Sequence, residues 1–325
     1  MKMGRLVAIR KIGFRLTRLQ RNMATAEAVI QEKKFKEVEI EVPWGKIAGK
    51  HWGPPDVEPI VALHGWQDNA GSFDNLIKYL PNNLSILAVD APGHGYSSWL
   101  PKGTMYTPLM YIQVIQRVKQ HYKMDKIGLI AHSMGAMWCF SYAVFAPQDI
   151  KFVIALDYFK FPELPPEKFL SYFFEDWNRF FRLDQLTNPP PRHSEAEAIS
   201  RYIKATNNSL DEEMCRILFE RGTTKHPDGT VSFNRDPYVQ CVFDPGLNNE
   251  QMVAMAKRLT CPYYVIKGES SRYKEKKELY FEVLKVLETT SSDFMFRTVP
   301  GTHHFHMKNT SHLADLINPF IQQHI

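Results

Sequence analysis

Short apolar segments alternate with helical patterns along most of this chain, and this alternation constrains the fold more than any other feature. The apolar segments are typical of buried strands and lie at residues 60–63, 84–89, 126–130, 152–156, 263–267 and 294–299. The helical patterns between them include residues 107–122, 134–145 and 274–287. Strands that alternate with helices form a largely parallel sheet with helices on both faces. The chain is therefore predicted to be an α/β protein.

The alternation is interrupted once, between residues 159 and 255. Prolines punctuate helical stretches there, and Phe, Tyr and Trp are frequent, above all in residues 158–181. We interpret residues 159–255 as a helical cap inserted between two strands of the sheet. The core is then expected to comprise residues 35–158 and 256–325.

A serine stands at the junction between a predicted strand and a predicted helix, in the segment Ile130-Ala-His-Ser133-Met-Gly135-Ala. This segment matches the G-x-S-x-G nucleophile elbow, except that Ala131 replaces the first glycine. The elbow is a strained turn that exposes the serine at the carboxyl end of the sheet. The helix that follows begins beside the hydroxyl, and its N-terminus favours developing negative charge. Ser133 is therefore the predicted nucleophile.

Two main-chain N–H groups are predicted to stabilise an oxyanion beside this serine. His64-Gly-Trp66 directly follows the strand at 60–63. In sites built on a nucleophile elbow, such a loop supplies one donor and the residue after the serine supplies the other. The predicted donors are the N–H groups of Trp66 and Met134.

Three histidines follow the last predicted strand, in Gly301-Thr-His303-His304-Phe-His306. In chains with this elbow, the catalytic base lies on the loop after the final strand. His303 is closest to the strand end, and His306 follows it at the usual spacing of three residues. We predict His303 as the base, with His304 as the alternative. No carboxylate or cysteine nearby in the sequence would complete a metal site, so we expect no metal and no other cofactor.

A carboxylate is needed to orient the base, and two residues compete for this role. It commonly follows the strand after the cap, three residues beyond a glycine, but Ser271 occupies that position here. Glu269 is a nearby carboxylate with the wrong spacing. Asp157 ends the strand at 152–156, from which some such enzymes take their acid. We predict Asp157 as the acid, with Glu269 or a weakened or absent acid as alternatives.

Three segments together resemble a known family. They are His64-Gly-Trp-Gln-Asp-Asn-Ala-Gly-Ser-Phe-Asp74, Asp90-Ala-Pro-Gly-His-Gly-Tyr-Ser-Ser98 and His132-Ser-Met-Gly135. The chain is similar, over roughly residues 35–325, to the serine hydrolase-like (Kraken-like) branch of the α/β hydrolases. This resemblance implies an α/β-hydrolase core with a helical cap, serine hydrolase activity and Ser133 as the nucleophile. It implies no particular substrate.

The expected reaction is acyl transfer on a small-molecule substrate, through an acyl-enzyme on Ser133. The aromatic residues of 158–181 favour an apolar pocket, and hence a hydrophobic carboxylic ester. One alternative is a non-catalytic binding protein on the same fold. Another is a carbon–carbon bond hydrolase that uses the same three residues, because a fold does not determine its chemistry.

The formal net charge of +5 is concentrated at the start of the chain. Residues 1–26 contain seven basic residues and no acidic one, and their amphipathic pattern resembles a mitochondrial targeting segment. The alternative is a basic leader before a working start at Met23, in a cytoplasmic protein. The remaining 33 basic and 35 acidic residues nearly balance, so no nucleic-acid partner is expected.

The rest of the composition places the protein in a broad class. No apolar run approaches the ~18 residues of a membrane-spanning helix, so no integral membrane segment is expected. The four cysteines are widely spaced, which favours a reducing, intracellular compartment over a disulfide scaffold.

Overall fold

The computed structural model describes residues 32–187, 189–241, 243 and 245–325, and the basic leader of residues 1–26 lies outside them. An eight-stranded sheet forms the centre, with the strand order β1-β2-β4-β3-β5-β6-β10-β11. Its strands are β1 (Phe35–Val42), β2 (Gly45–Trp52), β3 (Ile60–Leu63), β4 (Ile86–Val89), β5 (Ile127–His132), β6 (Ile150–Leu156), β10 (Tyr263–Gly268) and β11 (Phe294–Val299). The pairs β1–β2 and β2–β4 are antiparallel, whereas the strands from β4 to β11 run parallel.

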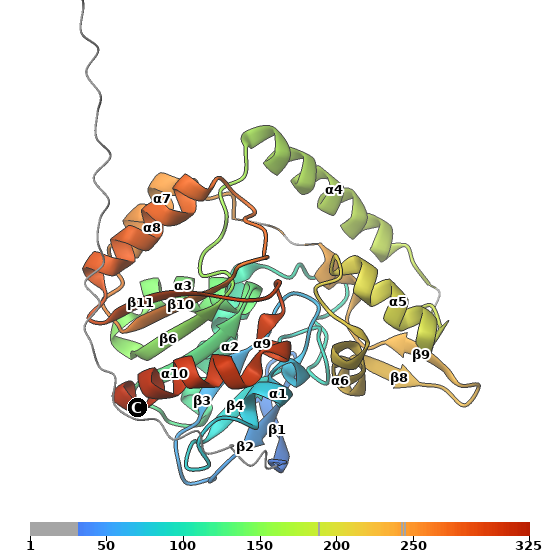
Figure 1. Cartoon of the computed structure of the whole chain (residues 1–325). Coiled ribbons are helices and arrows are strands. Elements are labelled where there is room, and N and C mark those ends of the chain that lie inside the picture. The colour runs from blue at the N-terminus through green and yellow to red at the C-terminus, as the bar shows by residue number, and fades with distance from the viewer. Residues whose placement is uncertain (1–31, 188, 242, 244) are drawn as a thin grey trace, which may run out of the picture. The chain divides into compact units, whose positions relative to one another are not determined.

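Helices cover both faces of this sheet (Figure 1). One face carries α2 (Pro108–His121), α3 (Met134–Phe145), α7 (Asn249–Ala256) and α8 (Lys277–Thr290), and the other carries α1 (Asp74–Ile77), α9 (Phe305–Lys308) and α10 (Thr310–His324). Successive strand residues point to opposite faces. In β3, for example, Val61 and Leu63 join the apolar cluster on the side of α3, whereas Ile60 and Ala62 join the cluster on the side of α10. The predicted α/β architecture is confirmed.

The central strand β5 extends two residues beyond its predicted end. Ala131 pairs with Leu63 of β3 on one side, and His132 pairs with Leu156 of β6 on the other. This pairing holds the backbone of β5 extended up to Ser133. Helix α3 then begins at Met134 and ends at Phe145, as predicted.

The predicted cap, residues 159–255, contains strands as well as helices. Its helices are α4 (Pro166–Asp184), α5 (Glu195–Ala205) and α6 (Glu212–Gly222), and a small antiparallel sheet adds β7 (His193–Ser194), β8 (Thr223–Lys225) and β9 (Thr230–Phe233). The prediction of a purely helical cap is therefore wrong in this respect. The missed signal is the turn between β8 and β9, which contains the dipeptide Asp228-Gly229 between two short Thr-containing segments. Helix α7, at the end of the predicted cap, packs Met252 and Ala256 into the cluster of the main sheet.

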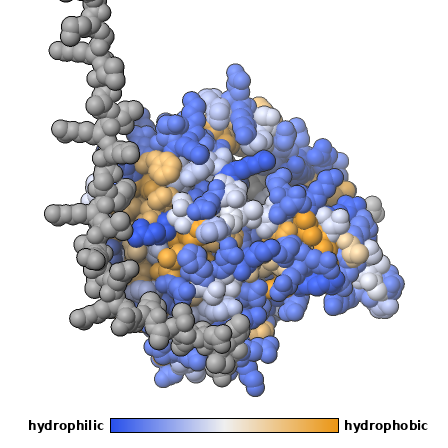
Figure 2. Space-filling view, viewed as in Figure 1, coloured by the Kyte–Doolittle hydropathy of each residue, from blue (hydrophilic) through white to orange (hydrophobic). Residues whose placement is uncertain are grey.

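Within the residues that the structure describes, no helix has the length and apolar character needed to cross a bilayer. Figure 2 shows that hydrophilic residues dominate the visible face of the molecule and that apolar residues gather there in separate patches. Some large apolar side chains are exposed on α4, including Phe174 and Trp177.

Candidate active site

Ser133 lies on a strained turn between β5 and α3. Its φ and ψ angles are 53° and −115°, a conformation that non-glycine residues rarely adopt. A hydrogen bond and a glycine explain how the chain adopts this turn. The N–H of Ser133 donates to the carbonyl of Leu156 at the end of β6. Gly135 lets α3 approach the neighbouring loop, since a Cβ atom there would lie 2.5 Å from the carbonyl oxygen of Leu63 and 2.8 Å from that of His64.

Asp157 and His303 meet at the carboxyl end of the sheet. Nδ1 of His303 lies 2.5 Å from Oδ2 of Asp157, and the carboxylate is fully buried. Asp157 directly follows β6 and His303 follows β11, so the ends of these parallel strands bring the two side chains together. Glu269, the alternative acid, is exposed after β10, and no contact between Glu269 and His303 occurs among the described residues.

The serine hydroxyl and the predicted base are not hydrogen-bonded to each other in this structure. Among the residues described, Ser133 Oγ forms no hydrogen bond with His303. Catalytic hydrogen bonds are often long in ligand-free structures and tighten when substrate binds. His132, the residue before Ser133, contacts the loop that carries His303: its Nε2 donates to the main-chain carbonyl of His303 at 2.9 Å.

Asp157 is held by several donors besides His303. Lys267 Nζ lies 2.9 Å from Oδ1, and the N–H of Gly268 lies 3.2 Å from the same oxygen. The hydroxyl of Ser271 donates to Oδ2 at 2.6 Å. Burial alone would raise the pKa of Asp157, but the hydrogen bond and charge of His303, followed by the charge of Lys267, hold this pKa below its ordinary value.

The other two histidines of the loop have different partners. Nδ1 of His304, the alternative base, lies 2.8 Å from the hydroxyl of Ser209 in the cap region. Nε2 of His306 lies 2.7 Å from the hydroxyl of Ser72. Both rings are buried, and neither contacts Asp157. Of the three histidines, His303 is therefore the one that the structure places beside the predicted acid.

His132, His303 and His304 form a group that could hold a metal ion, since each offers a nitrogen within 4.8 Å of the others. All three rings already have protein partners, so we do not assign these residues as metal ligands; His304, for example, contacts Ser209. His303 bonds Asp157, and His132 bonds the carbonyl of His303. Only the three loop histidines are close together in the sequence, whereas His132 joins them through the fold, from β5.

The N–H groups of Trp66 and Met134 have no hydrogen-bond acceptor among the described residues, so both remain available to a ligand. Two histidines hold the loop that carries Trp66. His94 accepts from the N–H of Gln67 at 3.2 Å, and His64 accepts from the N–H of Ala91 at 3.0 Å. Gln67 itself has a φ of 64°, so this loop is strained.

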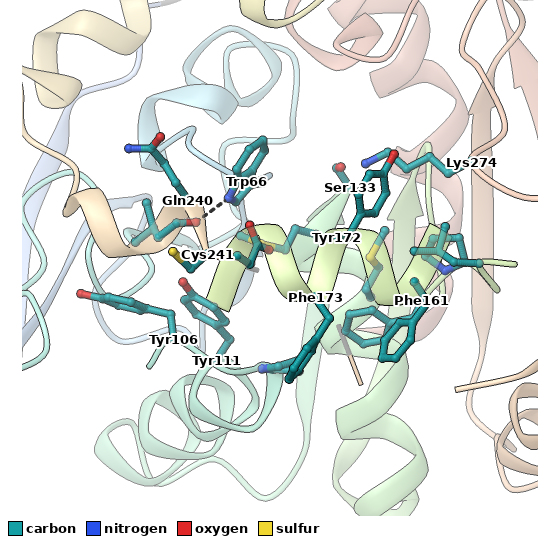
Figure 3. A pocket seen from close by; sticks show the side chains of 18 of the residues that line it. Trp66, Tyr106, Tyr111, Ser133, Phe161, Tyr172, Phe173, Gln240, Cys241 and Lys274 are labelled. Atoms are coloured by element: carbon teal, nitrogen blue, oxygen red, sulfur yellow. Dashed lines mark hydrogen bonds between the residues drawn. The ribbon is translucent and has the colours of Figure 1, made fainter. Parts of the chain in front are cut away.

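A cavity of about 480 Å³ opens at Ser133 (Figure 3). Trp66 and Met134 line it beside the serine. The indole Nε1–H of Trp66 donates to the carbonyl of Val239, and this hydrogen bond holds the Trp66 side chain in place. Most of the remaining lining is apolar or aromatic: Tyr106, Pro108, Tyr111, Met137, Trp138, Phe161, Pro162, Leu164, Phe169, Tyr172, Phe173 and Val239.

The aromatic residues predicted near the pocket divide into three groups. Phe161, Phe169, Tyr172 and Phe173 line the cavity. Tyr158, Phe159 and Phe180 are buried in the apolar cluster on the α3 side of the sheet. Phe174, Trp177 and Phe181 lie exposed on α4 outside the cavity lining.

Comparison with known proteins places this chain in a family. The model of the alpha/beta hydrolase fold matches residues 58–309. The chain belongs to the alpha/beta hydrolase fold family. This α/β hydrolase is 32% identical over 298 residues to a Drosophila melanogaster protein named "Probable serine hydrolase", with 91% of this chain and 90% of the relative covered. It is 31% identical to human "Serine hydrolase-like protein 2", over 89% of this chain and 94% of that protein. The resemblance to the serine hydrolase-like branch is confirmed.

Solved structures show the same fold. A hypothetical protein from Pseudomonas aeruginosa PAO1 superposes on this α/β hydrolase with a TM-score of 0.74 and 24% identity, over 88% of this chain and 99% of the other. A thioesterase domain from the curacin biosynthetic pathway superposes with a TM-score of 0.71 and 25% identity, over 87% and 99% of the two chains.

The structure of this α/β hydrolase adds site residues that sequence reasoning missed. Sequence periodicity assigns Lys267 only to the end of an apolar strand, although a lysine in that position is a signal for a buried counter-ion. Ser271 was noted for lacking a carboxylate, and its hydroxyl contacts the carboxylate of Asp157 instead.

Proposed function

We propose that this α/β hydrolase is a serine hydrolase that cleaves hydrophobic carboxylic esters through an acyl-enzyme on Ser133. His303 acts as the base and Asp157 as the acid that orients it. The observation that carries this proposal is the contact of His303 Nδ1 with Asp157 Oδ2, beside a strained serine at the carboxyl end of the sheet. A non-catalytic binding protein would have no need of this contact.

The hydrogen bond to Asp157 determines which nitrogen of His303 is free. When Nδ1–H donates to the carboxylate, Nε2 carries no proton and can accept one from Ser133. Burial lowers the pKa of His303 to about 3, with Asp157 acting in the opposite direction. The base is therefore neutral at physiological pH, as proton abstraction requires.

The reaction proceeds in two halves. Ser133 Oγ attacks the ester carbonyl carbon while His303 Nε2 takes the hydroxyl proton. The oxyanion is stabilised by the N–H groups of Trp66 and Met134, each worth about 2.7–4 kcal/mol in such sites. Collapse breaks the bond to the alkoxy group, which leaves as the alcohol with the proton from His303. Water then attacks the acyl-enzyme and gives a proton to His303, which passes that proton to Ser133 Oγ as the carboxylic acid leaves.

The lining of the cavity supports an apolar ester. Phe161, Phe169, Tyr172 and Phe173 would contact the acyl or alkoxy group over much of its surface. Burial of apolar surface contributes roughly 25 cal/mol per Å². A volume of about 480 Å³ suits a small molecule of moderate size.

The test is hydrolysis of p-nitrophenyl esters with acyl chains of two to twelve carbons. The wild type should hydrolyse the longer apolar members faster than the acetate, and Ser133→Ala should lose at least about 10³-fold in kcat. Ser270→Ala is the matched control, because Ser270 is an exposed serine on the loop after β10. If the Ser133→Ala variant retained the wild-type rate, the proposal would be wrong.

A further inference from the structure

Lys267 is a lysine buried within the candidate site, and the proposed mechanism gives it no role. It lies near the end of β10 with a side-chain exposure of 1%. Its Nζ lies 2.9 Å from Asp157 Oδ1 and 3.0 Å from Ser271 Oγ. The rings of Tyr158 and Tyr273 lie under the ammonium, with their centroids 4.7 and 4.9 Å from Nζ. The ammonium of Lys267 is thus held between Asp157, Ser271 and two aromatic rings.

The two oxygens of Asp157 have different partners. Oδ1 accepts from Lys267 and from the N–H of Gly268. Oδ2 accepts from His303 and from the hydroxyl of Ser271. Lys267 thus approaches the carboxylate from the side opposite to the base, and Ser271 connects the two sides by accepting from Lys267 while donating to Oδ2.

The charges of this group balance only while His303 is neutral. A buried carboxylate without a counter-ion is strongly destabilising, and an opposite charge beside it offsets that penalty. With Lys267 protonated and Asp157 ionised, the buried group has no net charge. Protonation of His303 would add a second cation to one carboxylate. Lys267 therefore makes the imidazolium less favourable than a histidine–aspartate pair alone would.

We propose that Lys267 is a positioning residue that keeps Asp157 ionised in the interior and holds His303 neutral to lower pH than the carboxylate alone would allow. This inference rests on the proposed function, because it concerns the base of that reaction. Lys267 acts through Asp157, and it neither contacts Ser133 nor lines the substrate cavity.

Other titratable groups surround the same site and must be constant in any test. Those facing His303, Asp157 or Lys267 include His132 from β5, Tyr158 after β6, Tyr273 and Lys274 after β10, Tyr280 on α8, His304 beside the base, His306 on α9, and Asp68 behind the histidines. Burial lowers the pKa of Lys267, and Asp157 opposes this effect. None of the variants below alters these surrounding groups.

The experiment measures how fast a fluorophosphonate labels Ser133 as a function of pH, together with the NMR titration of the His303 ring in ¹⁵N-histidine-labelled protein. Lys267→Gln removes the charge but keeps a donor of similar length. The midpoint of the acid limb and the ring titration should both move upward by about one pH unit. Lys267→Arg should restore most of the wild-type midpoint, because it restores the charge.

Lys50→Gln is the matched control. Lys50 is also a buried lysine paired with an aspartate, Asp74, with Nζ 2.6 Å from the carboxylate, but it lies on β2. This variant should leave the midpoint unchanged. It therefore separates a local charge effect from the general loss of a buried ion pair.

An unchanged or lowered midpoint in folded Lys267→Gln would overturn the inference. If that variant does not fold, Lys267→Met decides, because it removes the charge while filling the same buried space, and it should also move the midpoint upward. An unchanged or lowered midpoint in folded Lys267→Met would then overturn the inference. If the wild type takes no label at Ser133, the proposed function fails, whereas the ring titration still tests the effect of Lys267 on His303.

Discussion

The hydroxyl of Ser271 donates to Oδ2 of Asp157 at 2.6 Å, so the position at which the acid commonly stands instead holds a donor to a carboxylate from the neighbouring strand. Strands β6 and β10 are parallel neighbours, with Leu156 paired to Ile266. Their carboxyl ends therefore lie side by side at one edge of the sheet. An acid on either strand can reach a base on the loop after β11, which explains how Asp157 contacts His303.

The first prediction concerns the choice of acid. Asp157→Asn should lower kcat by about 10⁴-fold, because the amide no longer fixes the His303 tautomer or stabilises the imidazolium. Glu269→Gln is the control and should retain full activity, since Glu269 is exposed and makes no contact with the base. Ester hydrolysis by both variants, with circular dichroism to establish folding, checks the result. The opposite ranking would move the acid to Glu269.

The second prediction concerns the elbow. Gly135→Ala should strongly destabilise the protein, since the added Cβ would lie 2.5 Å from the carbonyl oxygen of Leu63. Ala131→Gly should cost no more than about 1 kcal/mol, because it only adds backbone freedom within a strand. Thermal unfolding of the two variants measures the difference. Equal melting temperatures would show that the close approach of α3 to β3 is unimportant.

The third prediction concerns pH and stability. Burial lowers the pKa of His94 to about 3, whereas this pKa is about 6.5 in the unfolded chain. The unfolded chain therefore binds the proton first as the pH falls. The stability contributed by neutral His94 is complete above about pH 6.5 and is lost at about 1.4 kcal/mol per pH unit between about pH 6 and pH 3.

Urea unfolding at pH 7.5, 6 and 5 tests this dependence. His94→Gln should have a shallower loss of unfolding free energy than the wild type, even if it is less stable at every pH. The exposed His121→Gln is the control and should keep the wild-type slope. A His94→Gln slope equal to that of the wild type would contradict the prediction.

The fourth prediction concerns the cavity. Phe173→Ala should raise KM for long-chain p-nitrophenyl esters by about tenfold or more, because burying a phenylalanine side chain is worth roughly 1.5–3 kcal/mol. Phe174→Ala is the control, since its neighbouring ring is 59% exposed and lies outside the lining. Similar changes in KM for the two variants would mean that the substrate does not bind against this face of α4.

The core of the fold could be predicted because each of its elements has a local signal. Ile60 to Leu63 is a short apolar run before His64-Gly65, and its strand has the predicted bounds. Helix α3 begins directly after Ser133 because the strained turn at the serine determines where the strand ends. The small sheet in the cap region had a weaker signal, since β8 has only three residues.

The candidate site was less accessible to sequence reasoning because its contacts join distant segments. Asp157 and His303 are 146 residues apart, and only the strand order places them together. Lys267 forms its ion pair across 110 residues. Such pairs depend on which strands are neighbours, and the local periodicity of a sequence does not contain that information.

The central claim is that Ser133 is a nucleophile activated by His303 and Asp157. The most direct measurement is labelling of the folded wild-type protein with a fluorophosphonate, with the modified residue mapped by mass spectrometry. We expect one stoichiometric adduct, on Ser133, which is absent in Ser133→Ala and forms far more slowly in His303→Ala. A folded wild-type protein that takes no label, or that is labelled at another residue, would contradict the claim.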